Sequence, residues 1–189
     1  MKHEVRLIGG QWKRSKLPVA DKPGLRPTPD RVRETLFNWL GQDLTGWRVL
    51  DAFAGSGALG FEAASRGAAE VLLLEQEPAL VASLNASRQR LKADTLRVQR
   101  GDALAWMRSA AGPFDLVLLD PPFDANLLAP ALAAAARLVR EGGFVYAESG
   151  APVAAPPVLV PHRDWRAGAV HFALLRRYTA AESPTRAAP

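Results

Sequence analysis

The chain contains no cysteine among its 189 residues. Disulfide bridges, thiolate zinc sites and a cysteine nucleophile are therefore excluded. Histidine is scarce too, and its three copies, His3, His162 and His171, show no spacing typical of metal ligands. We therefore expect no metal site, and the lack of cysteine is compatible with a reducing compartment.

Long hydrophobic runs are also lacking. No stretch of the sequence reaches the length of a membrane span, and the first residues hold no apolar core of signal-peptide length. A chain of 189 residues fits one ordinary domain with a small appendage, and it can bury a sizeable core. These limits favour a monomeric, cytoplasmic protein that does not bind a membrane.

Excess positive charge is confined to the start of the chain. Residues 1–33 carry nine basic and three acidic side chains, whereas the other 156 residues carry 15 basic and 16 acidic ones. A solvated edge would explain this, but charge concentrated beside a neutral domain favours a surface that binds nucleic acid. Arg33, with Asn38, could instead pack the first helix over a binding cleft. The side chains expected to contact phosphates are Lys13, Arg14, Lys16, Arg26, Arg31 and Arg33.

The first residues predict a β-hairpin. Residues 5–8 and 11–17 read as two short strands, and Gly9-Gly10 between them is typical of a two-residue turn. The second strand is basic and contains Trp12. Such a hairpin would present cations and a stacking ring together.

Regular alternation of strands and helices follows. After a loop at 18–27, Thr28 has the features of an N-cap and Pro29 those of the first helical position, and Gly41 ends that helix. From Arg48 onward the alternation predicts right-handed βαβ units and a parallel sheet with helices on both faces. The expected strands are 48–54, 70–75, 95–100, 114–120 and 143–147, and the expected helices are 58–66, 78–92, 103–110 and 126–140.

The end of the chain breaks this alternation. Residues 158–166 and 170–178 predict a second hairpin, with no helix between its arms. We therefore predict an α/β, Rossmann-like fold whose seven-stranded sheet is mostly parallel and is closed by a C-terminal antiparallel hairpin. The expected parts are an N-terminal basic β-hairpin extension over 1–27, a main domain over 28–179 and a disordered tail over 180–189.

A glycine-rich loop follows the first strand of the alternating region. Residues 55–60, Gly-Ser-Gly-Ala-Leu-Gly, match G-x-G-x-x-G, and Glu75 lies 20 residues after Gly55 at the end of the next strand. Such glycines let the backbone approach a ligand closely, and the acid can accept hydrogen bonds from ribose hydroxyls. The pattern fits a nicotinamide dinucleotide; a tight strand-to-helix turn without a ligand is the other explanation.

Asp51 argues against the dinucleotide. This carboxylate lies four residues before Gly55 at the same strand end, where it would repel a pyrophosphate. It favours a ligand with positive charge, such as S-adenosylmethionine, which carries an ammonium group and a sulfonium and no phosphate. Asp102 ends the third strand and could accept from the adenine amine, although capping the next helix explains it equally well.

The segment from Phe114 to Phe123 is the most informative part of the sequence. An apolar strand ends in Asp120 and is followed by Pro121-Pro122 and Phe123. A buried parallel strand delivers such an acid to the edge where open α/β sheets bind ligands. Hydrogen-bond acceptors beside a stacking ring fit an exocyclic amine on a planar base, so the segment predicts an amine-methylation site. The alternatives are that Asp120 caps a turn and Phe123 fills the core.

These motifs resemble those of the class I S-adenosylmethionine methyltransferases that act on exocyclic amines. The segments 10–18 and 24–40 are similar to the bacterial 16S ribosomal RNA guanine-N2 methyltransferases, and the resemblance continues to Tyr178. One departure is Pro29, where that family more often has threonine. The motifs alone leave adenine N6 and guanine N2 open. The resemblance implies the N2 amine of one guanine, with 16S ribosomal RNA in the small ribosomal subunit or a late precursor as the partner.

The resemblance also implies roles for individual residues. Asp120 and the Pro121 carbonyl would accept hydrogen bonds from the guanine amine, and Phe123 would stack on the base. The implied catalytic set is Asp120, Pro121, Pro122 and Phe123. The implied binding set for S-adenosylmethionine is Asp51, Phe53, Gly55, Ser56, Gly57, Glu75, Gln76, Asp102, Ala103 and Asp120.

Two other classes of function stay open at this point. One is a nicotinamide-dependent oxidoreductase, which is disfavoured by Asp51 and by the lack of a Tyr-x-x-x-Lys pair. The other is a non-catalytic RNA-binding module, which would keep the basic hairpin but would not need the segment from Asp120 to Phe123.

Overall fold

The main sheet of the computed structural model, which describes residues 3–20, 28–123, 126–179 and 181–182, has seven strands in the order β5-β4-β3-β6-β7-β9-β8. The pairs β3–β4, β3–β6, β4–β5 and β6–β7 are parallel, and β9 runs antiparallel to β7 and β8. The predicted α/β fold, with its C-terminal antiparallel hairpin, is confirmed. The strands are β3 Arg48–Asp51, β4 Glu70–Glu75, β5 Leu96–Arg100, β6 Phe114–Leu119, β7 Val139–Ser149, β8 Leu159–Ala167 and β9 Val170–Arg177.

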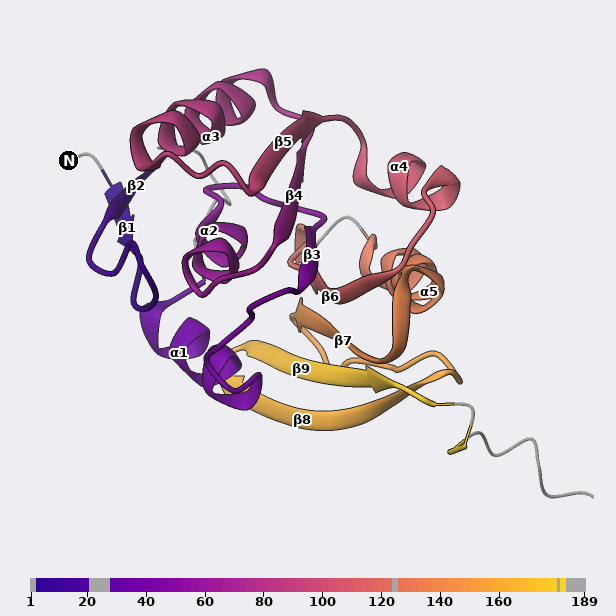
Figure 1. Cartoon of the computed structure of the whole chain (residues 1–189). Coiled ribbons are helices and arrows are strands. Elements are labelled where there is room, and N and C mark those ends of the chain that lie inside the picture. Colours follow the sequence, from indigo (N-terminus) through magenta and orange to yellow (C-terminus); the bar gives the residue numbers. More distant parts are fainter. Residues whose placement is uncertain (1–2, 21–27, 124–125, 180, 183–189) are drawn as a thin grey trace, which may run out of the picture.

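Helices cover both faces of the sheet, as Figure 1 shows. Successive strand residues point to opposite faces, so Leu116 and Leu118 of β6 join a cluster with α1 and α2, while Val117 and Leu119 join one with α4 and α5. The two buried clusters therefore lie on opposite sides of the sheet, as expected for a parallel sheet with helices on both faces. The helices are α1 Asp30–Trp39, α2 Ala58–Ser65, α3 Pro78–Leu91, α4 Ala103–Ser109 and α5 Leu128–Leu138.

The N-terminal hairpin is present, but its turn is not the predicted one. β1 (His3–Arg6) pairs antiparallel with β2 (Lys16–Val19), so residues 7–15 form the connection. The predicted two-residue turn at Gly9-Gly10 and the strand over 11–17 are therefore wrong. A Cβ on Gly10, whose φ is +72°, would lie 1.8 Å from the carbonyl oxygen of Ser65. This glycine lets the loop lie against α2 and does not make a tight turn.

The hairpin shares the core of the main domain. Val5, Leu7 and Leu17 are buried in the same cluster as α1 and α2. Trp12 is half-buried against that cluster, so the hairpin does not present it as a free stacking ring. Burial of these side chains fixes the hairpin to the sheet by the ordinary hydrophobic effect.

The first helix starts one residue later than predicted. Pro29 is the N-cap and Asp30 the first helical residue. Thr28 does not cap, because its hydroxyl donates instead to a buried carboxylate, Glu148 Oε1, at 2.6 Å. Residues 21–27, most of the predicted loop, and nearly all of the predicted tail over 180–189 lie outside the described residues.

Other boundaries differ by a few residues. β3 ends at Asp51 rather than at 54, because the glycine loop begins there. β7 runs from Val139 to Ser149 and is longer than the predicted 143–147. That extension places Glu148 within the strand. In the part of the chain that the structure describes, no helix is both long and apolar enough to span a bilayer.

Candidate active site

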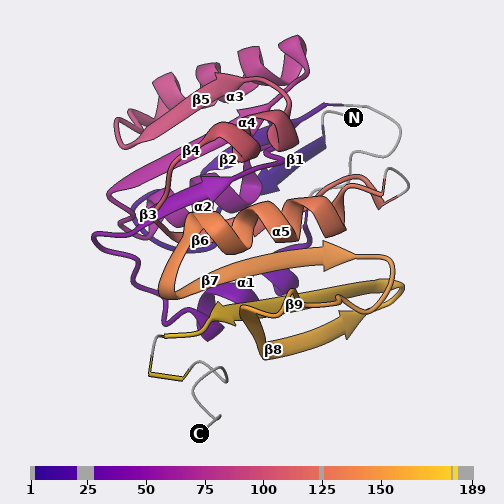
Figure 2. The same ribbon diagram turned by 90° about the vertical axis from the view of Figure 1, so that its right-hand side faces the viewer.

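Five parallel strands end at one edge of the sheet. Figure 2 shows β3 and β7 running toward this edge and β9 running away from it. The order of strands reverses at β3, which has β4 on one side and β6 on the other. In open α/β sheets such a switch point is where ligands bind. Asp51 and Glu75 are the last residues of β3 and β4, and Asp120 follows β6 directly.

The glycine loop is shaped by close approaches. Gly55 and Gly57 have φ angles of +54° and +80°, which favour glycine. A Cβ on Gly57 would lie 2.6 Å from Leu84, and one on Gly60 would lie 2.1 Å from Leu73. The loop therefore turns directly into α2, with Gly57 as the N-cap of that helix. Two other predicted residues, Phe53 and Ser56, are half-buried in it.

Glu75 is held by the backbone of this loop. Its Oε2 accepts from Gly55 N–H at 3.0 Å, and its Oε1 accepts from Glu77 N–H at 2.9 Å. Each carboxylate oxygen has a second lone pair, so both can also accept from ligand hydroxyls. Gln76, next in the chain, is exposed. The structure thus brings the predicted ribose acceptor and the glycine loop together.

Asp102 is the N-cap of α4. Its Oδ1 accepts from Ala105 N–H at 2.7 Å, and Ala103 is the first, buried residue of that helix. The capping explanation is therefore confirmed. Asp102 is exposed, so its other oxygen is accessible, and a contact with an adenine amine stays a prediction.

Asp51 is a buried acid in an unusual electrostatic setting. It is 1% exposed, and its Oδ2 accepts from Gly60 N–H at 3.0 Å. Burial raises the pKa of Asp51 from 3.8 to about 7, the Gly60 N–H opposes this, and the charge of Glu75 adds to it. Among the described residues, no basic side chain pairs with Asp51. A ligand that brings positive charge would lower this pKa and be bound in return.

The segment after β6 is partly exposed. Pro121 is buried, whereas Pro122 is exposed and the Phe123 ring is 49% exposed. The alternative that Phe123 fills the core is therefore wrong. Burial raises the pKa of Asp120 well above its ordinary 3.8, and the neighbouring charges of Glu148 and Asp51 raise it further.

One acid at this edge was missed by the sequence analysis. Glu148 is 5% exposed near the end of β7, and its Oε1 accepts from the hydroxyls of Thr28 and, at 3.1 Å, Tyr146. Burial raises the pKa of Glu148 to about 7, while the two hydroxyl bonds oppose the rise. The sequence contains a signal for it, because Glu148 directly follows the apolar stretch predicted as the strand 143–147, as Asp120 follows the apolar residues of β6.

Two of the predicted basic residues of the hairpin, Lys13 and Arg14, lie away from these acids. Lys13 and Arg14 are exposed in the loop 7–15, which binds Ser65 at the end of α2 through Gln11 N–H. The start of α2 is at the glycine loop, and eight helical residues span about 12 Å. These two cations therefore lie toward the opposite edge of the sheet. Lys16 forms an ion pair with Glu4 at 2.8 Å.

Arg33 must be removed from the predicted RNA contacts. Its side chain is 0% exposed and donates to Glu62 at 3.1 Å and to the carbonyls of Thr28 and Arg6. It joins α1 to α2, which agrees with the alternative that it packs the first helix; Asn38, in contrast, is exposed. Helix periodicity could not reveal this, because Glu62 is 29 residues away.

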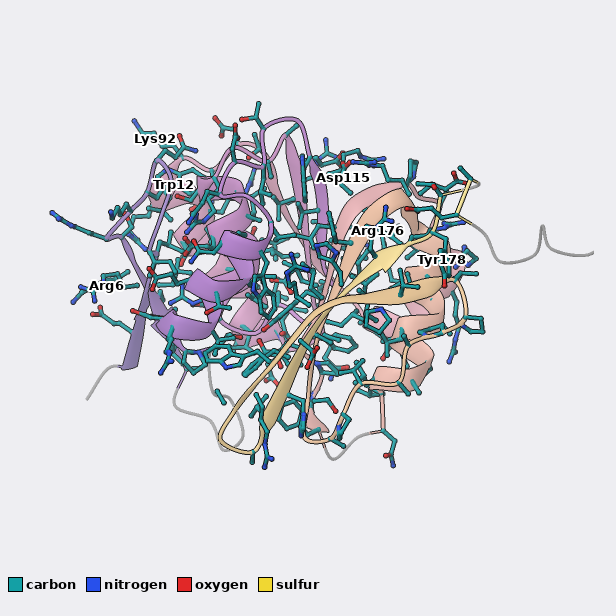
Figure 3. All side chains as sticks on the ribbon, turned by 90° about the horizontal axis from the view of Figure 1, so that it is seen from below. Arg6, Trp12, Lys92, Asp115, Arg176 and Tyr178 are labelled. Atoms are coloured by element: carbon teal, nitrogen blue, oxygen red, sulfur yellow. The ribbon has the colours of Figure 1, made fainter. Side chains whose placement is uncertain are left out.

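Arg31 and Arg6 are accessible cations nearer the start of α1. The Arg31 guanidinium lies 5.2 Å above the centre of the Trp165 ring of β8. Arg6, labelled in Figure 3, lies at the periphery of the molecule. Arg26, also predicted to bind RNA, lies outside the described residues.

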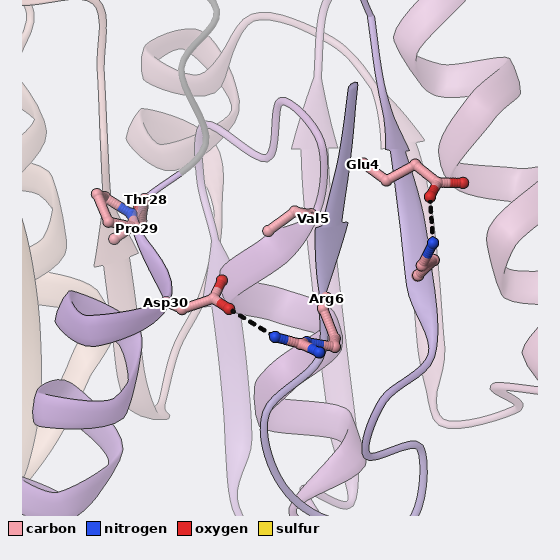
Figure 4. A pocket seen from close by; sticks show the side chains of 7 residues that line it. Glu4, Val5, Arg6, Thr28, Pro29 and Asp30 are labelled. Carbon is pink, nitrogen blue, oxygen red and sulfur yellow. Dashed lines mark ion pairs between the residues drawn. The ribbon is translucent and has the colours of Figure 1, made fainter. Parts of the chain in front are cut away.

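A cavity of about 350 Å³ lies between the hairpin and the start of α1. Its walls hold two ion pairs, Arg6–Asp30 and Lys16–Glu4 (Figure 4). Thr28 lines it too, and connects it to Glu148. The cavity is not lined by the glycine loop, so it is separate from the predicted donor site.

Comparison with known proteins gives consistent matches over nearly the whole chain. Residues 5–176 match the family described as "Conserved hypothetical protein 95". The "Ribosomal RNA small subunit methyltransferase D" of Escherichia coli K12 is 41% identical over 189 residues, which cover 95% of this chain and 93% of that one. The protein of the same name from Haemophilus influenzae is 45% identical over 135 residues, covering 69% and 70% of the two chains.

Solved structures agree with this. The structure of the Escherichia coli protein YhhF superimposes with a TM-score of 0.85 at 40% identity, and covers 94% of this chain and 99% of that one. A Haemophilus influenzae protein gives a TM-score of 0.81 at 34% identity, with 94% and 100% covered. At these identities the likeness extends beyond the general fold.

Proposed function

The chain belongs to the family described as conserved hypothetical protein 95, and from this premise we propose that it methylates the N2 amine of one guanine in 16S ribosomal RNA with S-adenosylmethionine as donor. It is a methyltransferase of small-subunit ribosomal RNA by its near full-length similarity to such an enzyme. The particular amine, the donor and the assembled subunit or a late precursor as substrate are the proposed part. A substrate of this kind implies action in the bacterial cytoplasm, and we propose a monomer.

One observation supports the chemistry most directly. Asp120 and its two prolines follow β6, and the glycine loop follows β3, its parallel neighbour in the sheet. A base-binding segment and a donor-binding loop are thus adjacent at the switch point. An oxidoreductase would not need the first of these, and an RNA-binding module would need neither.

The donor set fits S-adenosylmethionine. Asp51, buried and without a basic partner among the described residues, suits a cationic ligand, and Glu75 can accept from ribose hydroxyls. Gly55, Ser56 and Gly57 would give the backbone close access, and Asp102 would meet the adenine amine. S-adenosylmethionine would supply an electrophilic methyl group on a sulfonium. The remaining members of the proposed set are Phe53, Gln76 and Ala103.

The chain's own residues would position and deprotonate the amine. A guanine amine is a poor nucleophile because its lone pair is delocalised into the ring. Hydrogen bonds to the Asp120 carboxylate and the Pro121 carbonyl would orient it, and Phe123 would stack on the base for about 1–3 kcal/mol. Burial raises the pKa of Asp120, so its ionised form is a stronger proton acceptor once the new bond forms.

The test is methyl transfer with a defined product. Small subunits that lack the modification are incubated with the protein and methyl-labelled S-adenosylmethionine, and the RNA is digested to nucleosides. We expect one N2-methylguanosine per subunit, identified by mass spectrometry. Label in N6-methyladenosine, or no label in the presence of folded protein, would contradict the proposal.

A further inference from the structure

Glu148 lies next to Asp120 at the site edge. Leu119 of β6 pairs with Ala147 of β7, so the following residues, Asp120 and Glu148, stand opposite each other at the ends of neighbouring parallel strands. Such strands are about 4.8 Å apart. Leu118 and Tyr146, two residues earlier, face the α1 and α2 side, and side chains two apart share a face. Both acids therefore point to the same side of the sheet.

The surroundings of Glu148 leave one of its carboxylate oxygens available to a ligand. Its side chain is buried, and the groups of the described residues that shift its pKa are the hydroxyls of Thr28 and Tyr146 and no basic side chain. Both hydroxyl donors, from Thr28 and Tyr146, go to Oε1. They hold the carboxyl group in place and leave Oε2 as the oxygen that can accept from a ligand. A buried acid without a cation is costly for the fold, so stability does not explain it.

The chemistry of the base edge defines what such an acceptor would recognise. Beside its N2 amine, guanine carries an N1–H donor. Adenine has no hydrogen on N1, which is an acceptor beside the N6 amine. An ionised carboxylate next to the amine site therefore attracts guanine and repels the adenine edge. The motif from Asp120 to Phe123 by itself does not make this distinction.

We propose that Glu148, held by Thr28 and Tyr146, accepts the N1–H of the target guanine and selects guanine over bases that lack this donor. The inference rests on the proposed function and names the group that sets its base specificity. Asp120 and the Pro121 carbonyl hold the amine, and Glu148 reads the neighbouring ring position. Among the described residues, no three His, Cys, Asp or Glu side chains form a group that could hold a metal ion.

The first experiment compares Glu148→Gln with Glu70→Gln. Glu70 is the first residue of β4, at the end away from the candidate active site, and it pairs with Arg48. Replacing Glu70 should therefore leave methyl transfer unchanged. We expect Glu148→Gln to lower kcat/KM on small subunits about 10–100-fold, because a charge-assisted hydrogen bond is lost. Its affinity for S-adenosylhomocysteine should not change. Its midpoint of urea unfolding at pH 8 should rise, because a buried charge is removed. A residue with only a structural role would not make the variant slower and more stable together.

The second experiment tests base selection directly. The methylated guanine is mapped and replaced by 2-aminopurine, which keeps the N2 amine but lacks N1–H, in subunits reconstituted from ligated RNA. The wild-type protein should prefer guanine at least about tenfold, and Glu148→Gln should have a much smaller preference. The other difference between the two bases, at position 6, cancels in this comparison.

Three results would overturn the inference. These are wild-type kcat/KM in Glu148→Gln, a lowered unfolding midpoint together with weaker donor binding, and an unchanged preference for guanine over 2-aminopurine. If the wild-type protein makes no N2-methylguanosine at all, the proposed function fails as well. Normal transfer by the wild type with no effect of Glu148→Gln would leave the proposed function intact and remove only the role of Glu148.

Discussion

At the scale of single residues, the acids at the strand ends carry the chemistry. Three neighbouring parallel strands place Asp51, Asp120 and Glu148 at one edge of the sheet. Burial raises the pKa of each of these acids. The charges of neighbouring acids raise the pKa values of Asp51 and Asp120 further, so the site favours ligands that bring hydrogen-bond donors or positive charge. Each acid can therefore be tested separately, by whether its replacement changes ligand binding or the rate of methyl transfer.

Asp120 should act in the chemical step more than in binding. We expect Asp120→Ala to bind S-adenosylmethionine nearly normally, yet to methylate at least about a hundredfold more slowly in single-turnover assays on small subunits. Asp120→Asn keeps one hydrogen-bond acceptor and cannot take a proton. Residual activity in this variant would indicate that orientation dominates. Wild-type turnover by Asp120→Ala would exclude this segment as the active site.

Glu75 should act in donor binding instead. Its two oxygens are fixed by Gly55 and Glu77 N–H, so they are preorganised for ribose hydroxyls. Glu75→Ala should weaken S-adenosylmethionine binding by about 1–3 kcal/mol, measured by calorimetric titration. Glu70→Ala, at the other end of β4, is the matched control. Equal donor affinity in both variants would remove Glu75 from the site.

At the scale of elements, Glu62 of α2 connects the hairpin and α1 to the glycine loop. Its buried carboxylate accepts from the backbone N–H of Ile8 and Gly9, and it pairs with Arg33 and Arg66. A buried acid with two cations and two amide donors is a satisfied network. It explains why the hairpin stays on the domain although its own two strands are short.

Among the described residues, removing the charge of Glu62 should leave the buried Arg66 without a carboxylate partner and Arg33 with only the partly exposed Asp30. We expect Glu62→Gln to lower the free energy of unfolding by about 3–5 kcal/mol in urea titrations. The amides of Ile8 and Gly9 should lose protection from hydrogen exchange before the sheet does. Glu70→Gln, which breaks a partly exposed ion pair, should cost about 1 kcal/mol or less. Retained protection at Ile8 and Gly9 would contradict the role of Glu62 as the connection.

The loop of the hairpin, residues 7–15, is still predicted to bind RNA. Lys13 and Arg14 are exposed, and they lie at the far edge from Asp120, a distance that a large RNA can cover. Replacing both with glutamate should weaken binding to small subunits. The slope of the logarithm of the binding constant against the logarithm of the salt concentration should become smaller by about two. The affinity for S-adenosylmethionine should not change. Arg108→Glu on α4, on the other face of the sheet, is the control. A loss of donor binding with RNA binding would indicate a folding role for the loop.

At the scale of the whole molecule, the buried acids make stability depend on pH. The pKa values of Asp51 and Glu148 are raised from 3.8 and 4.5 to about 7, so the folded protein binds more protons than the unfolded chain between those values. Their contribution to stability is therefore full below about pH 4 and is lost as the pH rises through about 7.

The thermal unfolding temperature of the protein without S-adenosylmethionine should accordingly decrease as the pH is raised from 5 to 8. His162, whose pKa is lowered by burial, acts in the opposite direction, so the comparison with Asp51→Asn isolates the acid. We expect that variant to show a smaller fall. S-adenosylhomocysteine, which keeps the ammonium group, should stabilise the wild type more at pH 8 than at pH 5. An equal slope in both proteins would show that Asp51 does not titrate in this range.

The sequence by itself determined the parts of this protein that depend on short-range pattern. Alternating strands and helices predicted the parallel sheet, since strand and helix periods are local. Asp51, Glu75 and Asp120 could be placed at one edge, because the carboxyl ends of parallel strands meet there. The glycine loop followed from the same local rules, whereas the exposure of Phe123 was decided by the structure.

Only the tertiary structure decided which residues, distant in the sequence, bind the buried carboxyl groups. Thr28 and Glu148 are 120 residues apart, and Arg33 and Glu62 are 29 apart. From the sequence alone, Thr28 is predicted to cap a helix, and Arg33 is predicted either to contact RNA or to pack the first helix, because a hydroxyl or a guanidinium has the same local pattern in either role. The choice between them depends on what packs against the side chain after folding, and a buried partner outweighs local preference because burying an unpaired polar group costs more than a cap contributes.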